Sequence, residues 1–427
     1  MRLLIGLVAV LFATSASAEK RVVTADRYLD VATGRYVEHP AIFIGDDGRI
    51  TGIADARTVK WGADVRHIDM GGKTLLPGLI DMHVHLDGPA DIGGYRGLEF
   101  TDSFFGMAAV GNARAMLDAG FTTVRNVGSS NRNDIGLKQA IDNGYAIGPR
   151  IVPAGYALGA TGGHCDSTFL PPSLEKDKKE EGIGDGVEEL RHQVRRQRKF
   201  GAEVIKICAT GGVFSRNTEP GQQQLSETEM RAIADEAHQW GIRVAAHAHG
   251  ADGIKAAIRA GIDTIEHASL VDAEGIKLAL ARKQPVWFSM DIYNTEYTQA
   301  EGKKNGTLED NLRKDREIAQ AQRDNFRAAH RAGVRMVFGS DAGVMPHGQI
   351  GRQFATMVTY GMTPLDAIQA ATRNAAQALG RERDVGMIAV GRYADMVAVT
   401  GDPLSNIRLL EAPSGVIKGG TLVAHAQ

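Results

Sequence analysis

The stretch Gly241-Ile242-Arg243-Val244-Ala245-Ala246-His247 holds the pattern that decides the fold. A helix is expected just before it, over 226–240, where Ser226 and Glu229 form a capping box. Apolar residues recur along one face of that helix, and the glycine after it is the usual C-terminal cap. The apolar run that follows indicates a buried strand, and His247 ends it with a polar side chain.

The same unit, a helix followed by a short apolar strand, recurs along the middle of the chain. The other strands are expected at 79–84, 120–125, 151–157, 201–207, 261–267, 285–289 and 333–338. Eight strands alternating with helices predict the α/β class and a (β/α)8 TIM barrel. The chain has 427 residues, whereas such a barrel needs about 250. An accessory domain is therefore expected.

The two ends of the chain differ from the middle, because they contain short strands and hairpin turns. Strand-like runs lie at 21–24, 41–45 and 49–53, and Asp46-Asp47-Gly48 is a hairpin-turn signal. Similar runs follow residue 386. We expect the two ends to meet as one small β-sandwich domain. The predicted parts are a signal peptide (1–18), the N-terminal part of the β-domain (19–77), the barrel (78–385) and the C-terminal part of the β-domain (386–427).

The first residues have the features of a secretory signal peptide. Arg2 precedes an apolar run at 3–13, and Ala16-Ser17-Ala18 offers a cleavage site after Ala18. The run is too short for a transmembrane helix, which needs about 20 apolar residues. A periplasmic or secreted mature protein without a membrane anchor is expected, although a buried N-terminal strand stays open. A net charge of −2 gives no sign of a nucleic-acid partner.

The chain has two cysteines, Cys165 and Cys208. They could pair in an oxidising compartment. Cys208 lies two residues after Lys206 on a predicted strand, so both side chains point to the same side. We expect two separate, buried thiols rather than a disulfide.

Potential metal ligands stand at the same level of several predicted strands. They are His83, His85, Lys206, His247, His267 and Asp341. The first two are separated by one residue, so their side chains face the same side of a strand. Active sites of such barrels lie at the carboxyl ends of the strands. The sequence therefore predicts a metal centre there, since imidazole and carboxylate suit Zn²⁺.

Lys206 decides between one metal ion and two. An ammonium group cannot donate electrons to a metal ion. A lysine that has reacted with CO2 is a carbamate, and its two oxygens can bridge two cations. Zn²⁺ fits the donor set best, while Mn²⁺ and Co²⁺ stay open.

Several motifs together resemble the amidohydrolase superfamily, from about residue 20 to the C-terminus. They are His83-Val84-His85, Val204-Ile205-Lys206-Ile207, His247-Ala248-His249-Gly250, Glu266-His267, Gly339-Ser340-Asp341-Ala342-Gly343 and the tail Gly391-Arg392-Tyr393-Ala394-Asp395-Met396-Val397 with Asp402-Pro403. Within this superfamily, Thr161-Gly162-Gly163-His164 is similar to prolidase-like (Xaa-Pro) carboxypeptidases. That branch includes ochratoxin-degrading amidohydrolases.

The resemblance implies a binuclear centre and assigns its residues. One ion would be held by His83, His85 and Asp341, and the other by His247 and His267. The carbamate of Lys206 and a hydroxide would bridge them. Asp341 would act as general acid and base, and His164 would donate a hydrogen bond toward the developing oxyanion.

Other residues are candidates for holding the substrate. His249 faces the same way as His247 and either contacts substrate or supports the metal ligands. A substrate carboxylate could be bound by Arg216, Tyr293, Tyr297 or His347. Asn126 ends the second strand, where the branch more often carries aspartate.

The leading interpretation is a zinc-dependent hydrolase of small-molecule amides. It would cleave the amide bond to a C-terminal amino acid in dipeptides or N-acyl amino acids, with ochratoxin A, cleaved to ochratoxin alpha and phenylalanine, among the candidates. A mononuclear deaminase or imidazolone-type hydrolase is the alternative, and Lys206 argues against it. A non-catalytic scaffold is a third reading, which the complete ligand set opposes. Relatives of this kind commonly form homo-oligomers.

Overall fold

The computed structural model describes residues 20–168, 170–171, 173–174 and 181–425. The predicted signal peptide, residues 1–18, lies outside these ranges. Across the part of the chain that the structure describes, none of the helices combines the length and apolar character needed to cross a membrane.

Eight parallel strands form the barrel, as predicted. They are β6 (Leu79–Val84), β7 (Phe121–Asn126), β8 (Arg150–Pro153), β9 (Val204–Cys208), β10 (Arg243–Ala248), β11 (Thr264–His267), β12 (Trp287–Ser289) and β13 (Arg335–Val337). The first three pair in one sheet and the other five in another. Bridges between Leu158 and Ile207 and between Val84 and Ala342 close the ring on both sides. The TIM-barrel prediction is confirmed.

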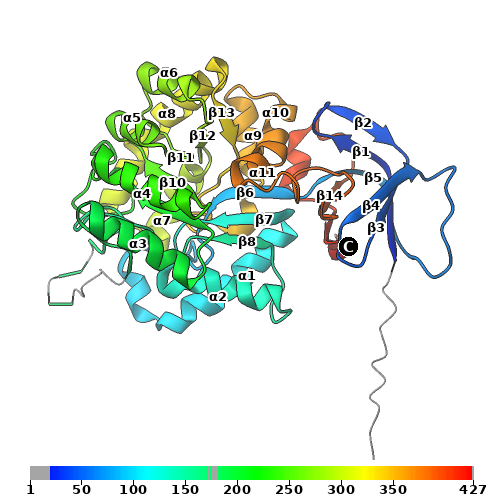
Figure 1. The fold of residues 1–427 in the computed structure, drawn as a ribbon, viewed down its shortest axis with the longest axis horizontal. Helices are drawn as coiled ribbons and strands as arrows, with labels where there is room; N and C mark the ends of the chain where they lie inside the picture. Colours follow the sequence, from blue (N-terminus) through cyan, green and yellow to red (C-terminus); the bar gives the residue numbers. More distant parts are fainter. Residues whose placement is uncertain (1–19, 169, 172, 175–180, 426–427) are drawn as a thin grey trace, which may run out of the picture.

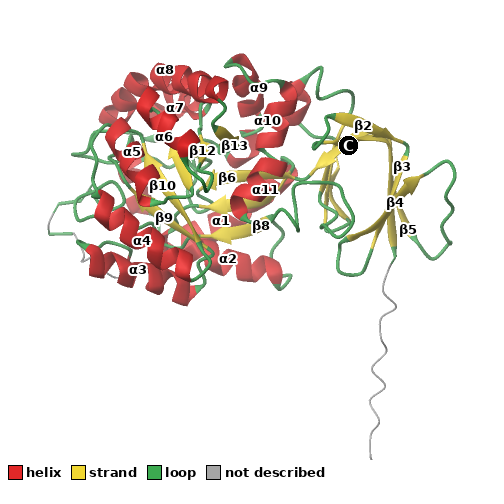
Figure 2. Ribbon diagram, turned by 45° about the horizontal axis from the view of Figure 1, so that its top comes forward, coloured by secondary structure: helices red, strands yellow, loops and turns green. Residues whose placement is uncertain are grey.

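Helices cover the outside of this barrel (Figure 2). They are α1 (Asp102–Asp118), α2 (Asn133–Asp142), α3 (Val187–Phe200), α4 (Glu227–Gln239), α5 (Ala251–Ala260), α6 (Ala273–Ala281), α7 (Asn294–Asn305), α8 (Glu309–Ala332), α9 (Arg352–Thr359), α10 (Pro364–Ala370) and α11 (Arg373–Leu379). The expected capping box of Ser226 and Glu229 begins α4. Gly241 follows that helix with a φ of +69°, a conformation that glycine adopts without strain.

The two ends of the chain meet in one eight-stranded sheet beside the barrel (Figure 1). Its strands are β1 (Arg21–Asp30), β2 (Arg35–Glu38), β3 (Pro40–Ile44), β4 (Ile50–Asp55), β5 (Arg66–Pro77), β14 (Met396–Val399), β15 (Gly415–Lys418) and β16 (Thr421–His425). The N-terminal β5 pairs antiparallel with the C-terminal β14, and Pro77 is opposite Met396. Buried residues from both ends, among them Ile42, Ile68 and Ile417, form a common core.

The sheet domain connects directly to the first barrel strand. β5 ends at Pro77 and β6 begins at Leu79, so a single residue separates the two. Gly78 fills this junction, where a Cβ atom would lie 2.1 Å from Thr122 Oγ1. Its amide donates a hydrogen bond to the Asp395 carbonyl oxygen at 2.8 Å. The strand that carries His83 is thus fixed from both ends of the chain.

Candidate metal centre and active site

The predicted metal ligands converge on one cavity at the carboxyl ends of the barrel strands. The cavity has a volume of about 300 Å³. Its lining includes His83, His85, Lys206, His247, His267 and Asp341, together with His164 and His249. These side chains come from strands, and from segments after strands, that are far apart in sequence, and the closed barrel brings them together.

A first group of donor atoms surrounds Asp341. Its Oδ1 lies 3.4 Å from His83 Nε2 and 3.5 Å from His85 Nε2. The outer nitrogens face oxygen atoms: His85 Nδ1 lies 3.0 Å from the Gly128 carbonyl oxygen, and His83 Nδ1 lies 3.1 Å from a Glu266 oxygen. Such outer contacts fix ring orientation and direct the Nε2 atoms inward.

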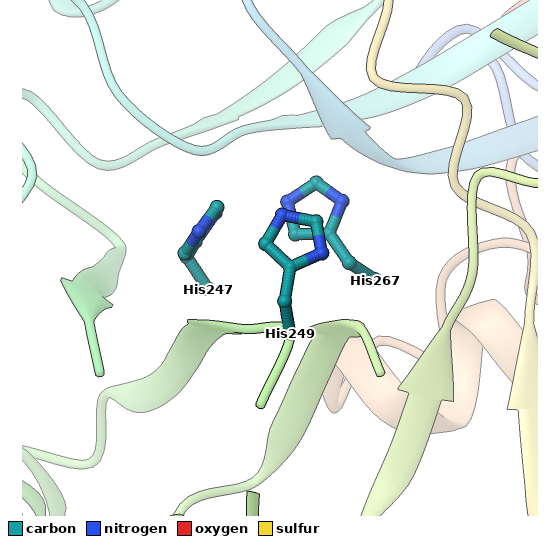
Figure 3. Close-up of side chains that lie close together, drawn as sticks. All are labelled: His247, His249 and His267. Carbon is teal, nitrogen blue, oxygen red and sulfur yellow. The ribbon is translucent and has the colours of Figure 1, made fainter. Parts of the chain in front are cut away.

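A second group is formed by His247, His249 and His267, whose ligand atoms lie within 4.8 Å of one another (Figure 3). His267 Nδ1 is 2.8 Å from Asp291 Oδ1, which leaves Nε2 free to bind a metal ion. His247 Nε2 is 3.1 Å from the Gly211 carbonyl oxygen, which leaves Nδ1. Burial lowers the pKa of His247 and of His249 well below the usual range, so both rings are neutral and offer lone pairs.

The donor types in these groups fit divalent metal ions. Buried imidazole nitrogens and a carboxylate are the usual ligands of Zn²⁺ and similar ions. A third set of close donors, His267, Asp291 and Asp341, joins the two groups. The groups are therefore adjacent, as the sites of two neighbouring ions must be.

Lys206 lies beside the first group. Its Nζ is 3.4 Å from His83 Nε2, and only 3% of the residue is exposed. Burial lowers the pKa of Lys206 to about 8. A larger share of this side chain is therefore neutral amine near pH 7 than in an ordinary lysine.

A buried ion pair stands behind the first group. Glu266 accepts a hydrogen bond from Arg125 at 2.7 Å, and Arg125 also donates to the Met82 carbonyl oxygen at 2.6 Å. Burial would raise the pKa of Glu266, but the charges of Arg125 and its neighbours outweigh burial and lower it. The ionised carboxylate faces His83. Neither Arg125 nor Glu266 was predicted to have a role in the site.

Asp341 combines an unusual backbone with a shifted pKa. Its φ is +56°, in the left-handed region that non-glycine residues rarely adopt, and His267 has a φ of +67°. Such backbone persists where the surrounding structure enforces it, often at active sites. Burial, followed by the nearby Asp291, raises the pKa of Asp341 to about 7. A carboxyl group with this pKa can both accept and donate a proton near neutral pH.

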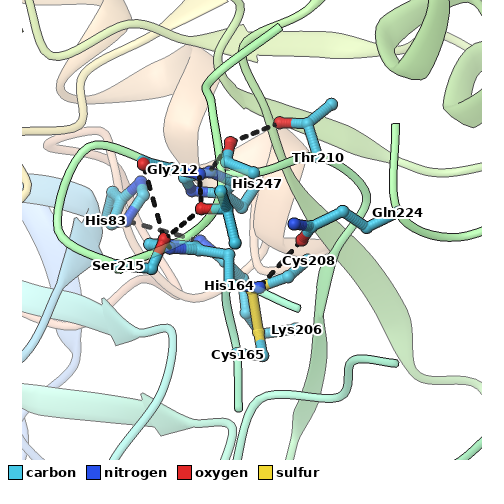
Figure 4. Close-up of a disulfide and its surroundings, with 12 residues drawn as sticks. His83, His164, Cys165, Lys206, Cys208, Thr210, Gly212, Ser215, Gln224 and His247 are labelled. Carbon is cyan, nitrogen blue, oxygen red and sulfur yellow. Dashed lines mark hydrogen bonds between the residues drawn. A yellow bond between two sulfur atoms is a disulfide. The ribbon is translucent and has the colours of Figure 1, made fainter. Parts of the chain in front are cut away.

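His164 borders the same cavity and packs on the second group. Its ring stacks on the His247 ring, with centroids 4.1 Å apart. Its Nδ1 is 2.8 Å from Ser215 Oγ, and its backbone amide donates to Gln224 Oε1 at 2.8 Å (Figure 4). Burial lowers the pKa of His164 to about 3, so the ring is neutral.

Comparison with known proteins agrees with this geometry. The model of a family described as the amidohydrolase family matches residues 74–423. The chain belongs to the amidohydrolase family. Together with its relatives, this membership makes it a hydrolase that acts on amide bonds.

Among its relatives, this amidohydrolase is similar to prolidases and ochratoxinases. An ochratoxinase of Aspergillus niger is 33% identical over 371 residues, which are 82% of this chain and 75% of the relative. A crystal structure of an Xaa-Pro dipeptidase with bound methionine is 34% identical, with a TM-score of 0.86 over 95% of this chain and 99% of the other. A prolidase complexed with N-methylphosphonate-L-proline is 32% identical, with a TM-score of 0.87 over 95% and 100%. The resemblance to prolidases and ochratoxinases is confirmed.

One expectation about the amidohydrolase was wrong. Cys165 and Cys208 form a disulfide at the edge of the cavity (Figure 4). The segment after β8 runs beside β9: Leu158 forms a parallel bridge with Ile207, and its amide donates to the Lys206 carbonyl oxygen at 2.8 Å. The loop that follows this bridge places Cys165 against Cys208. The two cysteines are 43 residues apart, so the chain pattern gave no sign of the contact.

The disulfide should stabilise the amidohydrolase measurably. It closes a loop of 43 residues, which corresponds to about 4 kcal/mol in the chain-entropy model. The double variant Cys165→Ala/Cys208→Ala is therefore expected to unfold at a clearly lower denaturant concentration. Equilibrium unfolding in urea, with the reduced wild type as a second arm, checks this. Equal midpoints for all three samples would contradict the prediction.

Four candidates for binding a substrate carboxylate do not line the cavity formed by the described residues. They are Arg216, Tyr293, Tyr297 and His347. Arg216 is exposed and donates to the Tyr95 hydroxyl oxygen at 2.7 Å. His347 is buried, and its Nε2 lies 3.1 Å from the His85 carbonyl oxygen. His347 thus lies behind a metal-ligand candidate.

Asp291 was not among the predicted site residues, but it lines the cavity and lies 2.8 Å from His267 Nδ1. Its oxygens accept hydrogen bonds from Asn294 at 2.5 Å and from Gln322 at 3.0 Å. Its position in the sequence could have indicated this place in the site, because Asp291 comes two residues after Ser289, the last residue of β12. Two ligand candidates, His85 and Asp341, likewise follow the ends of their strands, β6 and β13.

Asn126 has a structural reason to be an amide. Its Oδ1 accepts a hydrogen bond from the Leu86 amide at 2.7 Å. Its Nδ2 donates to the Gly128 carbonyl oxygen at 3.0 Å and to Asp134 Oδ2 at 3.2 Å. An ionised aspartate at position 126 could not donate a hydrogen bond to Asp134 and would repel its negative charge. The amide of Asn126 can donate this hydrogen bond.

Proposed function

We propose that this amidohydrolase is a binuclear zinc enzyme that cleaves the amide bond to a C-terminal amino acid. The observation that carries the proposal is the pair of adjacent donor groups with Lys206 beside them. The prolidase and ochratoxinase relatives support the bond that is cut. Dipeptides and N-acyl amino acids are the proposed substrate class.

The residues present fit two metal ions and a bridging carbamate. His83, His85 and Asp341 would hold one ion, and His247 and His267 the other. Lys206, neutral in part because it is buried, would react with CO2 to give the carbamate between them. When bound, such ions polarise the amide carbonyl and lower the pKa of water, so that a nucleophile forms at neutral pH.

Two further side chains would handle the proton and the developing charge. Asp341 would take the proton from the attacking water and give it to the leaving amine. His164 would donate a hydrogen bond to the carbonyl oxygen as negative charge develops on it. Glu266 and Asp291 would hold the rings of His83 and His267 in place.

The cavity wall supports a substrate with an apolar portion. Apart from the metal-ligand candidates and their neighbours, apolar side chains from several loops and from α8 line much of the cavity. These apolar residues are Val127, Ala157, Val213, Phe214, Ile318 and Val344. Ochratoxin A, an amide of phenylalanine, is accordingly one proposed substrate, with ochratoxin alpha and phenylalanine as products. The ochratoxinase of Aspergillus niger adds support from a relative.

We also propose that the mature enzyme is periplasmic or secreted. The sequence of residues 1–18 has the features of a signal peptide. The disulfide between Cys165 and Cys208 supports folding in an oxidising compartment.

A substrate screen combined with metal analysis tests the function. Purified enzyme is incubated with N-acyl amino acids, Xaa-Pro dipeptides and ochratoxin A, and free amino acids are quantified. We expect release of the C-terminal amino acid, about two Zn²⁺ ions per chain, and loss of activity with a chelator that added Zn²⁺ reverses. Release of ammonia with about one ion per chain would favour the deaminase alternative instead. Unchanged activity in the chelated, metal-free enzyme would contradict the proposal.

A further inference from the structure

The ring of His164 is closely confined. It stacks on His247, with centroids 4.1 Å apart and an interplanar angle of 30°. It also lies against Gly212, where an added Cβ atom would stand 2.2 Å from Cε1 and 2.3 Å from Nδ1 of the ring. Only glycine leaves room for the imidazole here. The orientation of the ring is therefore fixed by its contacts with the β9–α4 loop and with His247, a metal-ligand candidate.

One edge of this ring faces a chain of buried hydroxyl groups. Ser215 Oγ lies 2.8 Å from His164 Nδ1, and Thr218 Oγ1 lies 2.6 Å from Ser215 Oγ. The Gly212 amide donates to Thr218 Oγ1 at 3.5 Å. Ser215 is 2% exposed and Thr218 is 3% exposed. Solvent therefore has little access to these hydroxyls.

The amide at the start of this chain fixes only the first of its hydrogen bonds. A backbone N–H can only donate, so the oxygen of Thr218 accepts from Gly212. Either hydroxyl can be the donor between Thr218 and Ser215; when Thr218 donates, the proton of Ser215 is available to His164 Nδ1. The other acceptor for Ser215, the Gly212 carbonyl oxygen, is more distant, at 3.4 Å. In this arrangement His164 Nδ1 is an acceptor, and a neutral imidazole that accepts at Nδ1 carries its proton on Nε2.

Helix α8 holds the hydroxyl-bearing loop in place. Lys314, which is 1% exposed, donates to the Ser215 carbonyl oxygen at 2.6 Å and forms an ion pair with Asp310 at 2.9 Å. Asn311 donates to the Val213 carbonyl oxygen at 2.6 Å. These contacts fix the backbone on both sides of Phe214, and hence the Ser215 hydroxyl.

We propose that Ser215 is a positioning residue that keeps His164 in the Nε2-protonated tautomer, so that the ring offers an N–H donor to the cavity. The inference rests on the proposed function, because this donor matters only when an amide carbonyl is bound there. In the opposite tautomer, Nε2 would present a lone pair to the developing oxyanion. That arrangement repels the charge which the site has to stabilise.

The test combines a spectroscopic readout with kinetics on the zinc-loaded enzyme. Enzyme labelled with ¹⁵N-histidine is compared as wild type, Ser215→Ala and Ser215→Thr, and the His164 signals are assigned by their absence in His164→Gln. We expect an Nε2-protonated pattern in the wild type and in Ser215→Thr, which keeps the hydroxyl. Ser215→Ala should show a mixture of tautomers and a kcat lowered about 10- to 100-fold, with little change in KM for an N-acyl amino acid.

A second variant keeps the proposal testable if Ser215→Ala folds poorly. Thr218→Val retains the Ser215 hydroxyl but removes the donor that directs it, so a partial shift of tautomer and a smaller loss of kcat are expected. A wild-type spectrum with the proton on Nδ1 would overturn the proposal. So would a Ser215→Ala enzyme with an unchanged His164 spectrum and kcat. An Nε2-protonated wild type that shifts in Ser215→Ala but cleaves no amide supports the positioning role and contradicts only the proposed function.

Discussion

Lys206→Ala is expected to lose at least about 1,000-fold in kcat/KM, together with part of the bound metal. Metal ions contribute several kcal/mol to stabilising the transition state, and about 1.4 kcal/mol corresponds to tenfold in rate. The variant removes the proposed anionic bridge, so two adjacent cations would repel each other without compensation. Metal content by mass spectrometry and initial rates with an N-acyl amino acid check the prediction.

Two controls separate loss of the bridge from general damage. Lys283→Ala changes an exposed lysine outside the cavity and should keep both metal content and rate. Small carboxylic acids added to Lys206→Ala should restore part of the activity, because a free carboxylate can occupy the place of the carbamate. Full activity of Lys206→Ala with unchanged metal content would refute the binuclear model.

Asp341→Asn is expected to lower kcat by about 100- to 10,000-fold, the usual contribution of a general acid or base. The amide is close in shape to the carboxyl group but cannot accept or return a proton in the same way. Asp252→Asn, a change at an exposed carboxylate of α5, is the matched control and should keep its rate. Steady-state rates, measured alongside metal content, give the result.

The same variant distinguishes a proton-transfer role from a ligand role. A depsipeptide substrate has an ester in place of the amide, and its leaving group needs less help from an acid. If Asp341 protonates the leaving amine, Asp341→Asn should lose much less activity on the ester than on the amide. An equal loss of activity on both substrates, with one metal ion missing, would contradict the proton-transfer role and indicate that Asp341 acts only as a metal ligand.

Most of the barrel and the convergence of the candidate ligands could be predicted because both depend on local patterns. A helix, a glycine cap and an apolar strand are readable over a few residues, as in 226–247. Parallel strands align their carboxyl ends, so His83 and Asp341 were predicted to meet although 258 positions of the chain separate them.

What could not be predicted depends on the paths of loops. The Cys165–Cys208 disulfide needs the loop after Leu158, which pairs with β9, to bring Cys165 to Cys208, and no residue pattern encodes that path. Ser215 is one hydroxyl in a long polar loop, and only its distance to His164 gives it a role. Arg216, the adjacent residue, has the charge that a carboxylate site needs but points to Tyr95.

The junction between β5 and β6 sets a limit on when the metal centre can form during synthesis. β6 carries two ligand candidates, and it is bounded by β5, which pairs with β14 near the end of the chain. β6 also needs the segment after β13 as its other neighbour, where the Asp341 amide donates to the His83 carbonyl oxygen. A growing polypeptide therefore cannot complete the first group of donor atoms until β13 and β14 have been synthesised. A metal ion held by this group would thus be acquired only after these late strands have formed.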